Sequence, residues 1–244
     1  MAQKLQNVTI SAPGFSGINT QDSPIDLDPS FAKVADNCVI DSFGRIGARN
    51  GYELLTSDAT NLGASVGTES IFEYIDQSGD ITILSAGNNK IFSGTTTITE
   101  ITPAGYTCSA NNWKFANLNN HAFLFQSAHE SLVFTDAGGS NALAKFSSFG
   151  SSSGTAPQAN EVISAFGRLW AADVVGNKHT IFFSHLQTGY QWTGGSSGTL
   201  DLTTVLPGGA DDVVALAAHN GRLVIFCTNT ILIYAGPTNP ATMT

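Results

Sequence analysis

Basic residues are scarce in this chain. Its 244 residues include 10 Lys and Arg against 19 Asp and Glu, which gives a formal net charge of −9. A protein that grips nucleic acid needs clustered cations to neutralise phosphates, so this balance excludes such a grip as the main activity. It is compatible with a protein past which DNA slides, because weak binding is then an advantage.

Long apolar runs and cysteines are also few. No stretch reaches the roughly 18 apolar residues of a membrane span, and the start of the chain lacks the apolar middle of a signal peptide. We therefore expect a soluble protein with no membrane insertion. The three cysteines, Cys38, Cys108 and Cys227, are widely spaced. Their positions in or beside expected strands favour buried free thiols over a disulfide framework or a zinc knuckle.

Motifs for catalysis or metal binding are missing too. The five histidines show no H-E-x-x-H spacing, and no serine lies in a G-x-S-x-G elbow. Alternating oxygen ligands from Asp76 to Asp80 resemble a calcium loop, but the glycine comes too early and no glutamate closes it, which favours a hairpin tip. Asp211-Asp212 fits an acid/base pair or the start of a strand. The sequence predicts no enzyme, no cofactor and no metal.

Glycine and strand-forming residues are abundant, and they recur in a pattern. The 25 glycines and the low charged fraction of 12% indicate many turns and a β-rich chain. The clearest unit is Asp211 to Gly236, where turns at His219-Asn220-Gly221 and Thr228-Asn229-Thr230 separate three apolar runs. This pattern predicts three antiparallel strands in meander order.

Weaker copies of this unit lie upstream. Four equivalent positions, Ile91, Leu132, Ile181 and Ile231, are 41, 49 and 50 residues apart. A period of about 40 to 50 residues with about four strands per unit is typical of β-propeller blades. An ordinary meander or sandwich is the alternative. The predicted fold class is therefore all-β, with propeller blades that are incomplete in this chain.

The predicted domain organisation follows from the repeat. Residues 1–62 do not share it and form a loop-rich N-terminal docking arm, with a strand at Leu5 to Ile10, one helical turn after Asp28, and short hairpins around Ser42-Phe43-Gly44 and Asn50-Gly51. The tract Gly150 to Gly154 is expected to be a flexible connection. The blades are assigned as 63–104, 105–155 and 156–209, and 210–244 is the start of a fourth blade in a chain that we expect to be truncated.

Two segments carry a resemblance to a known family. The string DPSFAKVADNCVIDSFGRIGARNGY resembles the amino-terminal signature of the tail nozzle proteins (tail tubular protein B) of short-tailed bacteriophages. The segment DDVVALAAHNGRLVIFCTNTILIYAGPTNPATM resembles propeller strands of the same family. The resemblance covers residues 20 to 55 and 210 to 244, and the middle of the chain carries only the repeat.

This resemblance implies a structural virion protein. Family members form a hexameric tube distal to the portal and the adaptor, through which the genome leaves. The implied partners are five further copies, the adaptor or head-to-tail connector, and tail fibres, while viral DNA passes the lumen without specific binding. The implied location is the virion tail, assembled in the host cytoplasm. The competing hypothesis is a carbohydrate-binding or carbohydrate-processing propeller, because one fold serves many functions.

Four residues are candidates for a subunit interface. Arg45 and Arg49 are four apart on an expected strand and so share a face, where each guanidinium would fork to a carboxylate of a neighbouring chain, or simply face solvent. Tyr190 and Trp192 lie in an insertion of the third blade. They either project from a rim as a contact surface or pack between blades.

Overall fold

The computed structural model describes residues 14–51, 53, 67–136, 141–206, 208–209 and 211–243. The chain divides into two compact units, Met1–Leu54 and Leu55–Thr244. Each unit is described separately below. The predicted strand at residues 5–10 lies outside the described residues, as do Tyr52 and residues 54–66. The latter include all of the expected linker at 56–67 except its last residue.

The smaller unit contains two sheets of two strands. Parallel strands β1 (Gly17–Ile18) and β2 (Phe31–Ala32) form one, and antiparallel strands β3 (Cys38–Ile40) and β4 (Ile46–Ala48) form the other. The predicted hairpin around Ser42-Phe43-Gly44 is confirmed. A hydrogen bond from the amide of Phe15 to the carbonyl of Gly44, 2.8 Å long, ties the two sheets together.

The prediction of a helical turn after Asp28 is wrong. The carboxylate of Asp28 accepts the predicted capping bond from the amide of Ser30 at 2.8 Å. The chain then runs straight into β2, because the Ser30 and Ala32 carbonyls accept bonds from the amides of Ser16 and Asn19. Pairing with β1 satisfies these backbone groups, which an isolated helical turn would have left to solvent.

The larger unit consists of four successive antiparallel meanders. Three are four-stranded and the last is three-stranded, with the strands in sequence order in every sheet. Sheet 1 comprises β5 (Thr68–Ile75), β6 (Ile81–Gly87), β7 (Lys90–Gly94) and β8 (Ile98–Glu100); sheet 2 comprises β9 (Lys114–Leu118), β10 (His121–Phe125), β11 (Leu132–Asp136) and β12 (Asn141–Lys145); sheet 3 comprises β13 (Ala159–Ala165), β14 (Arg168–Val174), β15 (Thr180–Phe183) and β16 (Gly198–Asp201); and sheet 4 comprises β17 (Val213–His219), β18 (Arg222–Cys227) and β19 (Ile231–Ala235).

Tight turns with positive φ explain these hairpins. The β17–β18 turn has φ of 47° at Asn220 and 72° at Gly221, and the β9–β10 turn has φ of 46° and 63° at Asn119 and Asn120. Two successive residues of positive φ match the right-handed twist of paired strands, and asparagine and glycine tolerate that conformation best. The strands predicted on either side of the Asn220-Gly221 turn are confirmed.

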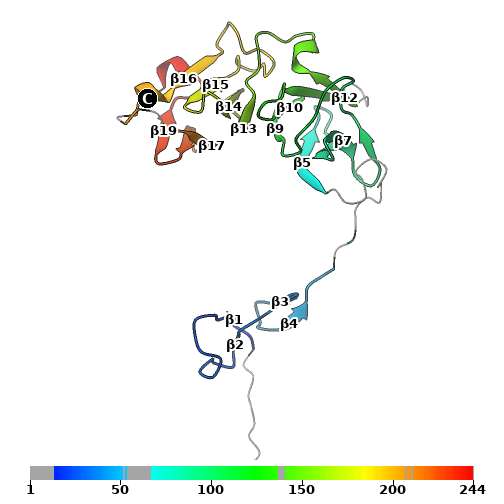
Figure 1. Cartoon of the computed structure of the whole chain (residues 1–244), viewed down its shortest axis with the longest axis vertical. Coiled ribbons are helices and arrows are strands. Elements are labelled where there is room, and N and C mark those ends of the chain that lie inside the picture. The colour runs from blue at the N-terminus through cyan, green and yellow to red at the C-terminus, as the bar shows by residue number, and fades with distance from the viewer. Residues whose placement is uncertain are drawn as a thin grey trace, which may run out of the picture. The chain divides into compact units, whose positions relative to one another are not determined.

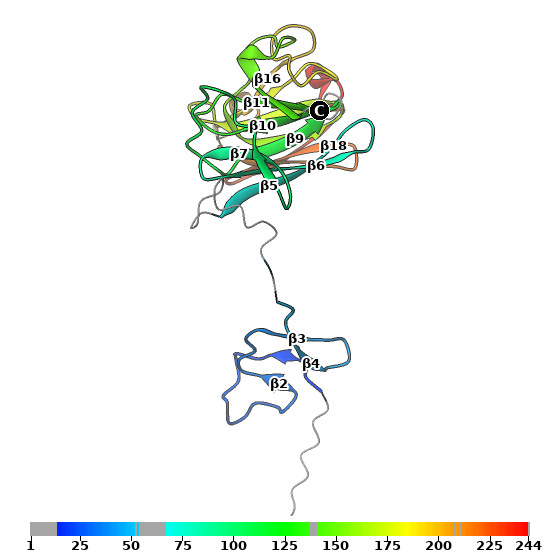
Figure 2. The same ribbon diagram turned by 90° about the vertical axis from the view of Figure 1, so that its right-hand side faces the viewer.

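The sheets stack face to face and bury three cores between them. We call the side of a sheet that is turned to the next sheet its following face, and the other side its preceding face. Between sheets 1 and 2 lie Tyr74 and Phe134, between sheets 2 and 3 Phe123 and Leu169, and between sheets 3 and 4 Trp170 and Leu223, among others. Figure 1 shows the sheets following one another along an open arc, and Figure 2 shows the same unit from the side.

The first strands of neighbouring sheets contact one another, β5 with β9, β9 with β13, and β13 with β17. Radial stacking with the first strand innermost is the arrangement of propeller blades. The predicted class, all-β with an incomplete set of blades, is confirmed, since none of the sheets closes a ring.

The predicted equivalence of repeat positions is wrong at one blade. Ile91 and Ile181 lie on the following faces of their sheets, whereas Leu132 lies on the preceding face, in the core shared with Tyr74. The neighbouring residue Val133 occupies the equivalent place, because it packs in the core between sheets 2 and 3. The β10–β11 loop is longer than the β6–β7 turn. A shift of one residue turns every side chain to the other face.

Helical structure in the described ranges is limited to three 3-10 turns, η1 (Phe146–Ser148), η2 (Leu202–Thr204) and η3 (Pro240–Thr242). No helix in the described part of the chain is long and apolar enough to cross a membrane. The tract Gly150 to Gly154, expected to be flexible, is instead held in place. The amide of Ser153 donates to the carbonyl of Tyr190 at 3.0 Å, and its carbonyl accepts from the amide of Trp192 at 2.8 Å.

Candidate functional site

Arg45 lies at the tip of the β3–β4 hairpin and already has a carboxylate partner within its own unit. Its Nε donates to Oδ2 of Asp41 at 2.8 Å, and its guanidinium lies 5.3 Å from the ring centroid of Phe43. The backbone amide of Arg45 is the main cause of a lowered pKa of the Asp41 carboxyl. The Arg45 side chain remains 75% exposed. A carboxylate from another chain would therefore share or replace an existing partner.

Arg49 lies directly after β4, at the end of the strand opposite to Arg45. Its amide donates to the carbonyl of Asn37 at 2.9 Å, and the residue is exposed. Since β4 spans only Ile46–Ala48, the two arginines flank the strand. Their role at a subunit interface stays a prediction.

Tyr190 and Trp192 do not project from a rim. The insertion between β15 and β16 folds back, and both rings pack against the core between sheets 2 and 3. Trp192 lies edge-on to Phe125 with centroids 5.9 Å apart, and its Nε1 donates to the carbonyl of Gly189 at 3.0 Å. Tyr190 contacts Phe149 and His121, with centroids 5.4 and 5.7 Å apart. The alternative of packing between blades is correct, because these rings bury more apolar area there than on a loop.

A buried arginine, Arg168, anchors the same insertion. It is 1% exposed and lies at the start of β14. Its Nη1 donates to the carbonyls of Ser184 at 3.1 Å and Ser196 at 2.8 Å, and its Nη2 donates to the carbonyl of Thr238 at 3.1 Å. Removal from water lowers the pKa of this guanidinium. One side chain therefore joins β14, the insertion and the segment after β19.

Aromatic rings cover the rest of the Arg168 side chain. The guanidinium carbon lies 5.5 Å from the Phe183 centroid and 6.0 Å from the Trp170 centroid. Sequence reasoning did not single out Arg168. A signal was available, because Gly-Arg-Leu occurs after the first hairpin turn in both sheet 3 and sheet 4, at 167–169 and 221–223.

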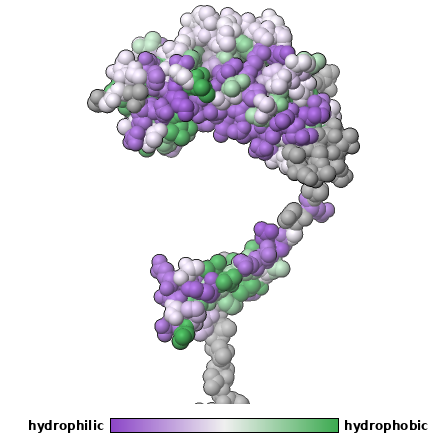
Figure 3. Space-filling view, viewed as in Figure 1, coloured by the Kyte–Doolittle hydropathy of each residue, from purple (hydrophilic) through white to green (hydrophobic). Residues whose placement is uncertain are grey.

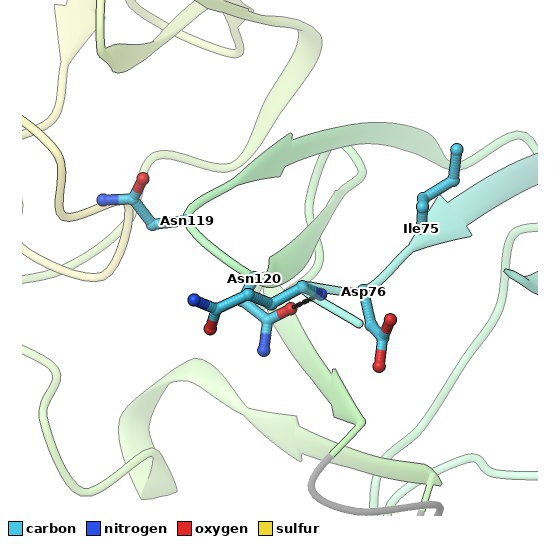
Figure 4. Close-up of a pocket in the computed structure, with 5 residues that line it drawn as sticks. Ile75, Asp76, Asn119 and Asn120 are labelled. Atoms are coloured by element: carbon cyan, nitrogen blue, oxygen red, sulfur yellow. Dashed lines mark hydrogen bonds between the residues drawn. The ribbon is translucent and has the colours of Figure 1, made fainter. Parts of the chain in front are cut away.

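An open cavity of about 410 Å³ lies between the β5–β6 and β9–β10 turns. Figure 4 shows Asn120 beside Asp76, with Asn119 and Ile75 on opposite sides. Side-chain oxygens of Asn120 and Asp76, which line this cavity, accept hydrogen bonds from backbone amides of the β5–β6 turn. Oδ1 of Asn120 accepts from the amide of Gln77 at 2.6 Å, and Oδ1 of Asp76 accepts from the amides of Ser78 and Asp80 at 2.8 Å each. The hairpin-tip interpretation of residues 76–80 is confirmed.

The remaining candidates for chemistry also have structural partners. Asp211 accepts bonds from the amide of Asn229 at 3.1 Å and the hydroxyl of Thr230 at 2.9 Å, so it closes the β18–β19 turn. His185 and His129 bond to nearby serines at turns. In the described ranges no group of three or more His, Cys, Asp or Glu side chains is placed to hold a metal ion.

Comparison with known proteins adds no assignment: no family model matches the chain, and no curated protein matches it.

Proposed function

We propose that this chain is a structural subunit of the tail nozzle of a short-tailed bacteriophage. In this role copies assemble, as a hexamer in the family that the chain resembles, into the tube below the portal and adaptor. The proposal is supported by the resemblance at residues 20 to 55 and 210 to 244, and by the all-β, blade-like sheets. It assigns the chain a role in assembly rather than in catalysis.

The observation that carries the proposal is the lack of a buried core in the described part of the N-terminal unit. None of the residues 14–51 is buried, although backbone hydrogen bonds pair both of its sheets. Large apolar side chains are exposed instead: Ile25 at 92%, Phe43 at 78%, Val34 at 70%, Ile18 at 55%, Val39 at 52% and Ile46 at 47%. Figure 3 shows hydrophobic atoms on the surface of this unit.

A segment of this size rarely folds stably alone, and contiguous apolar surface marks a place where another protein binds. An ordered backbone without a core is therefore suited to docking. In the proposed tube, this unit completes its core against a neighbouring subunit and locks the two together.

The charge of the blades fits passage of DNA. A tube wall that bound many phosphates at once would stop the movement of DNA, because many weak attractions add up to tight binding. After residue 55 the sequence has only six basic residues, Lys90, Lys114, Lys145, Arg168, Lys178 and Arg222. Of these, Arg168 is buried, and Lys90, Lys114 and Lys178 pair with carboxylates.

Electron microscopy of the purified protein and of virions tests the proposal. We expect ring or tube particles, and labelling of this chain at the tail. The variant Val34→Asp/Phe43→Asp should abolish the tubes without changing the unfolding of the blades, while Val175→Asp, at an exposed valine of the blades, should have no effect. A chain that stays monomeric in all conditions and is absent from virions would refute the proposal. Glycan-array binding or glycosidase turnover would support the carbohydrate class in its place.

A further inference from the structure

The two ends of the stack of sheets expose faces that are buried everywhere else. One equivalent position on the third strand of each sheet can be compared, because its side chain lies on the following face in all four. The residues at this position are Ile91, Val133, Ile181 and Ile231. The first three are 0%, 1% and 0% exposed, whereas Ile231 is 61% exposed. The first three face a next sheet, and in the described structure nothing covers Ile231.

Two rows of side chains on the following face of sheet 4 have this character. The strand register places Ala215, Phe226 and Ile231 in one row, and Ala217, Val224 and Ile233 in the next. Phe226 is 37% and Ile233 55% exposed. A flat grid of side chains with no polar member is the kind of surface that packs on another sheet. Figure 3 shows hydrophobic atoms at this end of the unit.

Arg222 extends the comparison. The residue directly after the first hairpin turn lies on the following face in three sheets, as His121, Arg168 and Arg222. In sheet 2 the insertion of sheet 3 covers His121 through Tyr190, 5.7 Å away. In sheet 3 the segment after β19 covers Arg168 through the Thr238 carbonyl. Arg222 is exposed, and its side chain has no hydrogen bond or ion pair with a described residue.

The preceding face of sheet 1 is exposed in the complementary way. In sheet 4 the preceding face is buried, as Leu223 and Ile225 at 0% show, whereas in sheet 1 Ile71 is 69%, Ile81 62% and Ile75 48% exposed. These isoleucines surround Glu73, which is exposed and pairs in register with Ile83. On β5 and β6 this face is therefore apolar around one carboxylate, whereas β7 and β8 add the buried Phe92 and the ion pair of Lys90 with Glu100. The following face of sheet 4 is apolar apart from His219 and Arg222, which pair at one end of it.

We propose that the following face of sheet 4 docks the preceding face of sheet 1 of a second copy of this chain, with Arg222 against Glu73. The contact repeats between copies the sheet-on-sheet packing that occurs three times within one copy. The two surfaces differ, so the contact is head-to-tail, and such contacts make rings when the rotation closes. The inference depends on the faces alone and stands whether or not the chain is a tail protein.

Mixing two blocked variants tests the head-to-tail geometry. Ile231→Glu blocks one face and Ile71→Glu the other, and both side chains are too exposed for the change to disturb a core. These changes are made in the Val34→Asp/Phe43→Asp background, which removes the contact proposed for the N-terminal unit. By sedimentation we expect the chain with both sheet faces intact to associate, each blocked variant alone to be monomeric, and the two mixed to stop at a dimer. Val175→Glu, at an exposed valine away from both faces, should associate like the chain with both faces intact. A chain with both faces intact that is monomeric up to about 1 mM, or blocked variants that associate normally, would overturn the proposal.

Charge reversal tests the pairing of Arg222 with Glu73. Arg222→Glu and Glu73→Arg should each lower the association constant by about tenfold or more, and mixing the two should restore it to within about threefold. Absence of rescue would overturn this pairing. Association in solution without incorporation into virion tails would support the docking and refute the tail proposal, whereas virion tails built by a chain with both faces blocked would do the reverse.

Discussion

The guanidinium of Arg168 donates a hydrogen bond to the backbone carbonyl of Thr238, 70 residues further along the chain. The same side chain bonds to the carbonyls of Ser184 and Ser196. Sheet 3, its insertion and the end of the described chain are therefore fastened at one buried charge. A buried cation that loses its hydrogen-bond partners costs free energy, because it has no water to replace them. The three carbonyls bound by Arg168 therefore restrict the packing of sheet 3 on sheet 4.

Arg168→Met should destabilise the larger unit by about 2 to 4 kcal/mol, because the volume is kept but the buried carbonyl of Ser184 and the carbonyls of Ser196 and Thr238 lose their donor. The matched control is Arg222→Met, at the exposed equivalent position in sheet 4, which should change stability by less than about 0.5 kcal/mol in dilute solution. Urea unfolding followed by tryptophan fluorescence measures both. Equal effects of the two changes would show that the Arg168 contacts are not what holds the segments together.

Gly221→Val should cost about 1 to 3 kcal/mol and loosen the last hairpin. The residue has φ of 72° and no neighbouring atom within 4 Å of an added Cβ, so the cost comes from backbone conformation alone. Gly208→Val is the control, since that glycine also has open space but no positive φ. Thermal unfolding of both variants gives the comparison, and an unchanged melting temperature for Gly221→Val would contradict the turn described here.

Trp192→Ala should destabilise the monomer rather than act at a subunit contact. The ring packs between sheets 2 and 3 and its Nε1 is hydrogen-bonded, so we expect a loss of about 2 to 4 kcal/mol. Phe43→Ala removes a 78% exposed ring from the other unit and should leave unfolding of the blades unchanged. Denaturation of a dilute sample separates the two roles. A Trp192→Ala protein with normal stability but impaired assembly would restore the interface interpretation.

Acid should weaken the β18–β19 turn through Asp211. Burial raises the pKa of this carboxyl, but bonds from Thr230 and Asn229 outweigh it, and the net pKa lies below the ordinary value of 3.8. A lowered folded-state pKa contributes stability that is complete above 3.8 and is lost as the pH falls through the lowered value. Asp211→Asn should therefore flatten the fall of unfolding free energy in this acid range. Asp212→Asn, at a side chain without these bonds, should follow the wild type, and identical slopes for all three proteins would exclude this role.

Arg45→Ala/Arg49→Ala should weaken assembly before it affects the fold of the blades. Both side chains are exposed, and the pair of Arg45 with Asp41 lies within one hairpin, so the change removes little stability. Light scattering of the assembled protein against salt concentration provides the measurement. Lys178→Ala, which removes a cation paired with Asp173 in the blades, is the control. Normal assembly of the double variant would rule out an interfacial role for the two arginines.

Much of the fold was predictable from the sequence because its elements are local. Asn220-Gly221 and the apolar runs on either side specify a hairpin through backbone conformation and alternation, which depend on neighbours in the chain. The same holds for the turn at Asp76 to Asp80 and for the meander order of four successive sheets. The prediction of a helical turn after Asp28 was wrong even though the capping bond forms, because β2 pairs with β1 and its backbone groups find hydrogen-bond partners there.

Tertiary structure alone decided which faces and side chains are covered. Leu132 and Val133 are adjacent and both apolar, and the register in which β11 pairs with β10 determines which of them faces sheet 3. Arg168 and Arg222 both follow a turn glycine and precede leucine, yet one is buried and the other exposed. Burial depends on what packs from distant parts of the chain. Sequence thus determined the strands and turns, and packing between sheets determined the role of each residue that they carry.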